Sequence, residues 1–223
     1  MHNIGGTFSF FGANIATIEQ FYLILPLYYT SMGMKKRIAL FISGRGSNME
    51  AILECCRAGI LQNVAQPILV FSNNADAKGL ATAQKMGIET QVIESKGLKR
   101  LTFDAKVLEL LQNYQPDYIV LAGYMRILSP LLVQAYPQRI INIHPADTTQ
   151  HQGLHGYEWA FENKLPTTKI TVHYVDEGLD TGNIIAQKIV DLNGTTSLEE
   201  VEQRGLQAEH EFYSSVLYQV MQG

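Results

Sequence analysis

Along most of the chain, short apolar runs alternate with stretches whose apolar residues recur at helical spacing. The apolar runs, rich in Ile, Val, Leu and Phe, lie at 37–42, 66–71 and 117–122. The stretches with helical spacing lie near 47–58, 76–86 and 101–114. Such short runs are typical of parallel strands that are buried on both faces. A more polar strand at 89–93 is expected nearer an edge. The alternation predicts an α/β fold with a doubly wound, mostly parallel sheet and helices on both faces.

After residue 144 the pattern changes, and polar segments separate the expected elements. We expect a loop at 145–156, a short helix at 156–163, and strands at 168–175 and 183–190. The polar segment between these two strands carries Asp180. Ser197 and Glu200 have the spacing of a capping box, which predicts the start of a final helix. The apolar face expected on that helix consists of Leu198, Val201, Leu206, Phe212, Val216 and Val220.

Residues 1–33 differ in composition from the rest of the chain. They contain no Lys or Arg and a single acid, Glu19. Their apolar run at 21–29 is too short to span a bilayer and is broken by Pro26. A signal peptide would need a basic region before its apolar run, and none is present. We expect residues 1–33 to be an extension outside the fold, with 34–223 forming a single domain. A segment that lies in a membrane interface is the alternative.

Charge and cysteine content narrow the function classes. The formal net charge of −4 gives no sign of a general nucleic-acid-binding surface. Cys55 and Cys56 are adjacent within a predicted helix, where neighbouring side chains point in different directions. They are therefore interpreted as reduced, packed thiols of a cytoplasmic protein. No Cys/His spacing matches a zinc site, so no metal is expected.

The segment at 141–145, Ile-Asn-Ile-His-Pro, is the strongest chemical signal in the chain. If it ends a strand, Asn142 and His144 share one face, because strand side chains alternate. An amide donor beside an imidazole suits a reaction that builds negative charge on a carbonyl oxygen and moves a proton. Asp180, in Gly-Leu-Asp-Thr-Gly at 178–182, can supply a carboxylate that orients the imidazole. The alternative is that Asn142 caps a turn and His144 is a strand-end histidine with satisfied hydrogen bonds.

The glycine-rich segment at 43–48, Ser-Gly-Arg-Gly-Ser-Asn, follows the first strand and opens a helix. Its glycines let the backbone approach an anion, and free N–H groups at a helix start bind phosphate. Met49 stands where a dinucleotide fingerprint has its third glycine, and no Gly-Lys-Ser/Thr of a Walker loop follows. The segment therefore favours a single phosphate over NAD or ATP, with a structural turn as the alternative.

A third candidate segment, 124–128, follows the strand at 117–122, at the end where open α/β sheets bind ligands. Met125, Ile127 and Leu128 offer an apolar wall for a planar heterocycle. A plain apolar core is the alternative for these three residues. His173 lies on a predicted strand with apolar neighbours, where a core histidine with satisfied hydrogen bonds is the usual interpretation.

Taken together, these motifs resemble the folate-dependent formyltransferases, most closely those that act on glycinamide ribonucleotide. The resemblance covers residues 34 to about 221 and rests on segments 38–48, 71–76, 121–130 and 153–155, Asn-x-His-Pro and Leu-Asp-x-Gly. It implies transfer of a formyl group from 10-formyltetrahydrofolate to the primary amine of glycinamide ribonucleotide, in purine synthesis. It also implies small-molecule substrates, a monomer or homodimer, and neither nucleic-acid binding nor stable membrane insertion.

The resemblance also assigns roles to residues. The catalytic group would be Asn142, His144 and Asp180. The substrate phosphate would contact Gly46, Ser47 and Asn48, and Glu209 would reach the substrate from the last helix. Arg100 would contact the same phosphate or the folate tail, with a surface arginine as the alternative. The folate would lie against Met125, Arg126, Ile127, Leu128 and Val175. His173 would lie close to the site, behind the catalytic residues.

One segment departs from the family. Formyltransferases of purine synthesis usually continue His-Pro with an apolar, proline-stiffened turn, whereas this chain has a polar sequence at 146–152. Tyr157 and Trp159 also replace commoner polar residues and are expected to restore packing around this segment. The departure lies on the substrate side, so two alternatives stay open. One alternative is a formyltransferase of the same family with another amine acceptor. The other is a relative that binds ligands without catalysis.

Overall fold

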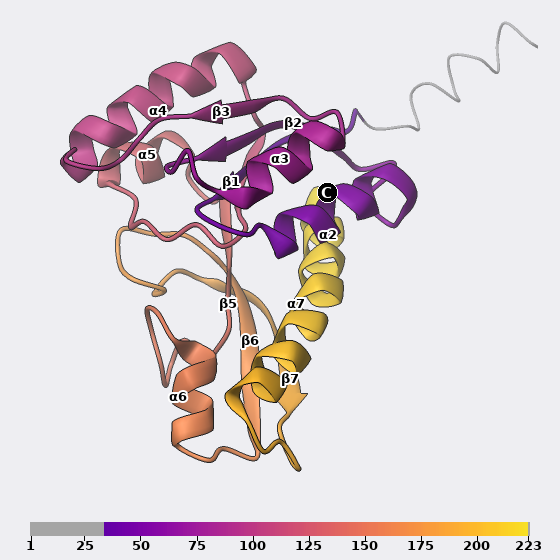
Figure 1. Cartoon of the computed structure of the whole chain (residues 1–223). Helices are drawn as coiled ribbons and strands as arrows, with labels where there is room; N and C mark the ends of the chain where they lie inside the picture. The colour runs from indigo at the N-terminus through magenta and orange to yellow at the C-terminus, as the bar shows by residue number, and fades with distance from the viewer. Residues whose placement is uncertain (1–33, 223) are drawn as a thin grey trace, which may run out of the picture. The chain divides into compact units, whose positions relative to one another are not determined.

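Seven strands form one sheet in the order β3-β2-β1-β4-β5-β6-β7 (Figure 1). The computed structural model describes residues 34–222, and the extension expected over residues 1–33 lies outside this range. The strands are β1 (Lys36–Ile42), β2 (Ala65–Ser72), β3 (Thr90–Val92), β4 (Tyr118–Leu121), β5 (Ile140–His144), β6 (Thr167–Tyr174) and β7 (Ile184–Asp191). The first five strands of this order, β3, β2, β1, β4 and β5, pair in parallel. Strand β6 pairs antiparallel with both β5 and β7. The predicted fold class is confirmed, and the polar strand is the edge strand β3.

Helices connect the strands close to where the sequence pattern predicts them. They are α2 (Ser47–Ala58), α3 (Lys78–Lys85), α4 (Arg100–Tyr114), α5 (Pro130–Ala135), α6 (Gly156–Glu162) and α7 (Leu198–Met221). Helix α5 has no counterpart in the predicted pattern. Its six residues, starting with a proline, are too few for a helical period to stand out. Over residues 34–222, no helix is both long enough and apolar enough to cross a membrane.

Successive side chains of the central strands point to opposite faces of the sheet and pack into two separate cores. Along β1, Ile38, Leu40 and Ile42 pack into a cluster that also includes buried residues of α2, α3 and α7. Ala39 and Phe41 point the other way, into a cluster with α4 and α5. In Figure 1, α4 lies above β1 and β2, and α2 lies below them. Strands β1, β2 and β4 contribute buried residues to both cores, which explains their continuous apolar sequences.

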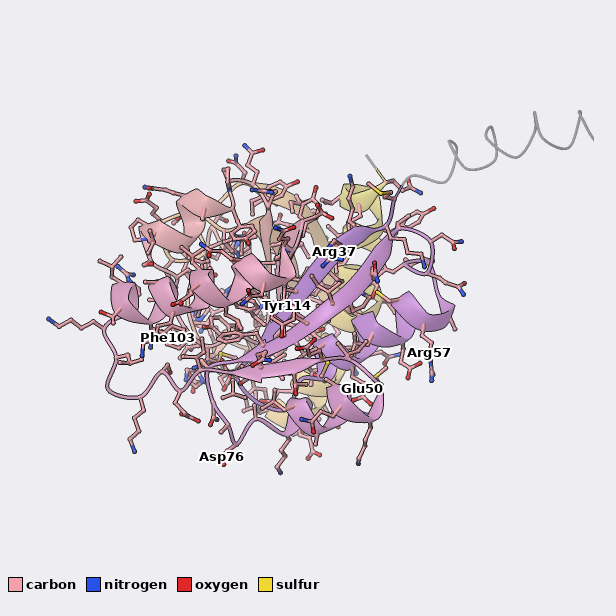
Figure 2. All side chains as sticks on the ribbon, turned by 90° about the horizontal axis from the view of Figure 1, so that it is seen from above. Arg37, Glu50, Arg57, Asp76, Phe103 and Tyr114 are labelled. Atoms are coloured by element: carbon pink, nitrogen blue, oxygen red, sulfur yellow. The ribbon has the colours of Figure 1, made fainter. Side chains whose placement is uncertain are left out.

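Helix α4 is fixed to the sheet by contacts near both of its ends, and Figure 2 labels Phe103, Tyr114 and Arg37, which make them. Near its start, Phe103 is fully buried in the second core. At its end, the Tyr114 carbonyl accepts a hydrogen bond of 2.7 Å from the Arg37 guanidinium on β1. The Arg126 guanidinium lies over the Phe103 ring at 4.4 Å from its centroid. Helix α4 thereby supports the segment that follows β4.

The sheet changes character at β5. Its register with β6 pairs Asn142 with His173 and His144 with Thr171. Ile140, on the same face of β5, belongs to the core under α4 and α5. The two residues that follow on this face, Asn142 and His144, are polar. The face therefore runs from a helix-covered apolar core into a polar strip, as the alternation in the sequence predicts.

The final helix begins as predicted but buries a different stripe. Ser197 accepts a hydrogen bond from the Glu200 N–H, while the Glu200 carboxylate accepts one from the Thr196 N–H. The buried stripe runs through Gly205 and Glu209. The expected apolar face is therefore wrong in part, because Leu206 is only half-buried. A stripe with glycine and glutamate in it carries no apolar signal.

Gly205 leaves a notch on α7 that the Tyr157 ring of α6 fills. A Cβ at this position would lie 2.1 Å from the Tyr157 Cζ. We expect Gly205→Ala to destabilise the fold by about 1–3 kcal/mol through overpacking. In a Tyr157→Ala background the same change should be neutral or stabilising by up to about 1 kcal/mol, since Ala favours helices over Gly.

Urea unfolding of the four proteins of this cycle measures both values. If Gly205→Ala costs the same in both backgrounds, the notch does not depend on Tyr157.

Candidate active site

A cleft of about 400 Å³ opens at the carboxyl ends of β4 and β5. Its lining comes from residues 121–128, 142–145, 153–155 and 173–180. Open α/β sheets bind ligands at this end of their strands, where the connecting segments diverge. The cleft brings together the predicted catalytic group and the segment at 124–128, which are separate in the sequence.

The Asp180 carboxylate lies at the centre of the polar end of the cleft. Its Oδ2 accepts a hydrogen bond of 2.8 Å from the Gly153 N–H and lies 3.5 Å from His144 Nδ1. Its Oδ1 accepts a 3.3 Å hydrogen bond from Asn142 Nδ2 and lies 3.5 Å from His173 Nε2. Burial raises the pKa of Asp180, but His173, the Gly153 N–H and His144 outweigh it and hold this pKa below 3.8. The carboxylate is therefore ionised at neutral pH.

His144 is buried and held from both sides of its ring. Its Nε2 lies 3.0 Å from the carbonyl oxygen of His151. A carbonyl only accepts, so Nε2 must carry a proton and donate it there. The other nitrogen, Nδ1, faces Asp180. Burial lowers the pKa of His144 from 6.5, although Asp180 and the His151 carbonyl act in the opposite direction. His144 is therefore neutral at neutral pH, with an unprotonated Nδ1.

His173 has the opposite arrangement. Its Nδ1 donates to the Tyr174 carbonyl at 2.9 Å, which leaves Nε2 as an acceptor when the ring is neutral. That Nε2 lies 3.3 Å from Asn142 Nδ2. His173 was expected behind the catalytic residues, and its ring directly contacts Asn142 and Asp180. Its strand position opposite Asn142, a pairing that the sequence pattern does not give, explains the contact.

The apolar side of the cleft is formed by the segment after β4. Met125 and Ile127 are 66% and 47% exposed, whereas Leu128 is buried. Exposed apolar side chains on a cleft wall are the feature that separates this segment from plain core. Arg126 and Val175, also predicted to contact the folate, line the same cleft. The five predicted folate residues are thus brought together.

Ser43 is a residue of this region that the sequence interpretation left without a role. Its hydroxyl accepts a hydrogen bond of 2.8 Å from the Met125 N–H. The same hydroxyl donates to Asn73 Oδ1 at 2.6 Å. Ser43 therefore connects the loops after β1, β2 and β4. The sequence feature that could have indicated this role is the position of Ser43 at the end of the first predicted strand.

The glycine-rich loop lies at the start of α2 and outside the lining of the cleft. Gly46 precedes the helix with a φ of +77° and packs within 3.1 Å of Gly79, measured from its ideal Cβ. Side chains larger than hydrogen do not fit this approach. No side chain caps α2, so its first N–H groups are free to bind an anion. Ser47 beside them is partly exposed.

Asn48 and Glu209, 161 positions apart in the sequence, meet beside this loop. Asn48 Nδ2 donates to Glu209 Oε2 at 2.5 Å, and the Tyr157 hydroxyl donates to Glu209 Oε1. Burial raises the pKa of Glu209, while the hydrogen bonds from Tyr157 and Asn48 act in the opposite direction. The pattern gave Glu209 only as part of a charged pair on a helix. Arg100, the first residue of α4, is exposed and does not line the cleft.

The polar loop after His144 is confirmed, but its first residues are buried. Ala146, Asp147 and Thr148 are at most 5% exposed. The His151 ring stacks on Trp159 at 5.0 Å between centroids, which fits the expected packing role of Trp159. Within residues 34–222, no group of three or more Cys, His, Asp or Glu side chains is placed to hold a metal ion. The cleft thus combines amide and imidazole donors, a carboxylate and an apolar wall, a set suited to acyl transfer.

Known proteins share this architecture. The profile of a family described as formyl transferase matches residues 36–217. The chain is 37% identical over 187 residues to the phosphoribosylglycinamide formyltransferase of Bacillus subtilis, covering 83% of this chain and 95% of that protein. It is 36% identical over 181 residues to the Escherichia coli protein of the same name, covering 81% and 84%.

A crystal structure of glycinamide ribonucleotide transformylase 1 from Symbiobacterium toebii superimposes with a TM-score of 0.81 at 35% identity. The superposition covers 86% of this chain and 90% of that one. The family profile spans all seven strands and most of α7.

Proposed function

This chain belongs to the formyl transferase family, and on that premise we propose that it is a folate-dependent formyltransferase of purine synthesis. The donor is 10-formyltetrahydrofolate and the acceptor is the primary amine of glycinamide ribonucleotide. One observation carries this proposal, namely the grouping of Asn142, His144 and Asp180 at one end of the cleft. The names of the Bacillus subtilis and Escherichia coli relatives support the acceptor.

The reaction begins when the acceptor amine attacks the formyl carbon on N10 of the folate. A carbon–nitrogen bond forms, and the formyl oxygen takes the electron pair as an oxyanion. Asn142 donates to this oxygen from Nδ2, exchanging one of its two 3.3 Å hydrogen bonds for a shorter one. Removing a donor of this type costs about 10²–10³ in rate.

The attacking nitrogen becomes an ammonium and must lose a proton. His144 takes this proton at Nδ1, which is unprotonated at neutral pH. The imidazolium that forms is stabilised by Asp180 at 3.5 Å and adds its charge to the stabilisation of the oxyanion. It then gives the proton to N10 as the bond between N10 and the formyl carbon breaks. No covalent intermediate on the protein is needed, and His144 returns to its starting state.

The folate lies in the cleft, with its heterocycle against the apolar wall of Met125, Ile127 and Leu128. Arg126 and Val175 complete this subsite. The acceptor lies on the other side, with its phosphate on the free N–H groups of Gly46, Ser47 and Asn48. Helix starts favour phosphate through these N–H groups and through the helix dipole.

Glu209 and Arg100, which lie outside the lining of the cleft, are also assigned to substrate binding. We infer that Glu209, which accepts a hydrogen bond from Asn48, also accepts one from a ribose hydroxyl. Arg100, exposed at the start of α4, attracts the anionic groups of either substrate. The protein acts in the cytoplasm, in keeping with its two free cysteines, Cys55 and Cys56. A monomer or a homodimer would both serve, because the proposed residues come from a single chain.

An assay with 10-formyltetrahydrofolate and glycinamide ribonucleotide tests this function. We expect wild-type turnover, and a loss of at least about 10²-fold in kcat for Asn142→Ala, His144→Ala and Asp180→Ala. The folate absorbance change measures the rate, and circular dichroism checks the fold. Near-wild-type turnover by a folded His144→Ala protein would contradict the mechanism. Turnover with another amine but not with this ribonucleotide would leave the family assignment in place and change the acceptor.

The acid side of the pH profile reports the proton acceptor. His144 must be neutral to take the proton, and its pKa lies below 6.5. We therefore expect kcat to be constant near pH 7 and to fall only below about pH 6.5. Asp180→Asn should shift this fall to still lower pH, since it removes a negative charge that raises the pKa of His144. Measurements of kcat at saturating substrates give the profile, and a fall centred above pH 7 would exclude His144 as the base.

The phosphate site has a matched control. We expect Ser47→Ala to raise the KM for glycinamide ribonucleotide about tenfold, since a hydrogen bond to a charged group contributes about 1.5–3 kcal/mol. The KM for the folate should stay within about twofold. Ser197→Ala removes a serine from the start of another helix, α7, and should change stability without changing either KM. An equal rise of both KM values in Ser47→Ala would argue against a phosphate contact.

A further inference from the structure

The loop at 146–153 contacts both members of the proposed proton-transfer pair. The His151 carbonyl accepts the Nε2 proton of His144 at 3.0 Å. Two residues on, the Gly153 N–H donates to Asp180 Oδ2 at 2.8 Å. Both contacts are made by backbone groups, so they depend on the path of the loop and not on side-chain identity. Whatever fixes that path also fixes His144 and Asp180.

Asp147 is the anchor of this loop. Its side chain is 7% exposed and receives Lys169 Nζ of β6 at 2.7 Å. It also accepts hydrogen bonds from the N–H and the hydroxyl of Thr149, at 3.1 and 2.7 Å, and from Gln187 of β7 at 3.3 Å. Although burial raises the pKa of Asp147, the Lys169 and Thr149 hydrogen bonds outweigh it and lower this pKa to about 2. The side chain is therefore a charged link between the loop and two strands.

The backbone of Asp147 also holds the part of the loop that leads to His151. The Asp147 carbonyl accepts from the N–H groups of Gln150 and His151, both at 2.9 Å. The preceding carbonyl, of Ala146, accepts from the Thr171 hydroxyl of β6 at 2.7 Å. The turn from Asp147 to His151 is thus closed by hydrogen bonds at both ends. At the end of this turn, the His151 carbonyl lies within hydrogen-bond distance of His144.

We propose that Asp147 is a positioning residue for formyl transfer, which holds the loop so that the His151 carbonyl fixes the proton of His144 on Nε2. This inference rests on the proposed function. The physical reason lies in the two tautomers of a neutral imidazole. Without the carbonyl, the proton is better placed on Nδ1, where the Asp180 carboxylate accepts it. Nδ1 then has no lone pair for the proton of the attacking amine, and the base is lost.

Other titratable groups around His144 do not replace this contact. The groups facing it are Asp180 from the 175–183 segment, His173 from β6, and the His151 ring, which stacks at 6.3 Å between centroids. Asp180 favours a proton on Nδ1, since only that nitrogen faces it. The His173 Nε2 contacts Asn142 Nδ2 at 3.3 Å and Asp180 Oδ1 at 3.5 Å. Among the residues at 34–222, the His151 carbonyl is the group that selects a proton on Nε2.

The test uses the full-length protein labelled with ¹⁵N at histidine. Long-range proton–nitrogen spectra identify which ring nitrogen of His144 carries the proton in the free protein. We expect a proton on Nε2 in the wild type and a shift toward Nδ1 in Asp147→Ala. The kcat should fall about tenfold or more, as a wrong tautomer costs a base its function. Asp147→Asn keeps an acceptor for Thr149 but loses the negative charge that faces Lys169, so its tautomer and kcat should lie between those of the wild type and Asp147→Ala.

Asp191→Asn is the matched control. Asp191 also accepts the N–H of the residue two positions on, Asn193, but at the far end of β7. It should leave the tautomer and kcat unchanged. A folded Asp147→Ala protein that keeps the proton on Nε2 would overturn the proposal, even if kcat falls, because the loss would then be structural. Failure of the wild type to formylate the ribonucleotide would refute the acceptor, and the spectra would still decide the role of Asp147.

Discussion

The Asp180 carboxylate is the group on which the arrangement of the site depends, because three segments of the chain converge on it. The loop after β5 gives it the Gly153 N–H, β5 gives it Asn142 and His144, and β6 gives it His173. A buried carboxylate without partners is costly, so its charge holds these segments together. The contacts that stabilise the charge also aim an amide and an imidazole into one cleft. Stabilising the fold and preorganising the site are here the same interaction.

This convergence is possible because the apolar, helix-covered face of the sheet ends within β5. Strands β1, β2 and β4 are covered on both faces by apolar packing, because each contributes buried residues to both cores. On one face of β5, the apolar row ends at Ile140 and continues as Asn142 and His144. The antiparallel β6 places His173 opposite Asn142. Loops cover this part of the face instead of helices, and loops can supply the backbone donors and acceptors that a polar site requires.

Local patterns in the sequence predicted what depends on local structure. Strand alternation gave the shared face of Asn142 and His144, and helix spacing gave the strand and helix positions. Three features were missed for different physical reasons. Helix α5 is too short to show a period, Glu209 meets Asn48 only through the packing of α7 on α2, and the partner of His144 is a backbone carbonyl. Contacts between distant segments, and contacts of the backbone, leave no residue pattern to find.

The departure of the 146–152 segment from the family pattern is better explained by support of the site than by a change of acceptor. A polar turn in place of a proline-stiffened one must find its rigidity elsewhere, and Asp147 provides it through Lys169, Thr149 and Gln187. Its side chain points to the strands and not into the cleft, whose lining begins again at Gly153. Asp147 and Thr149 thus hold the loop in place. The groups that reach the cleft from this segment are a carbonyl and an N–H, which any sequence with the same backbone path would offer.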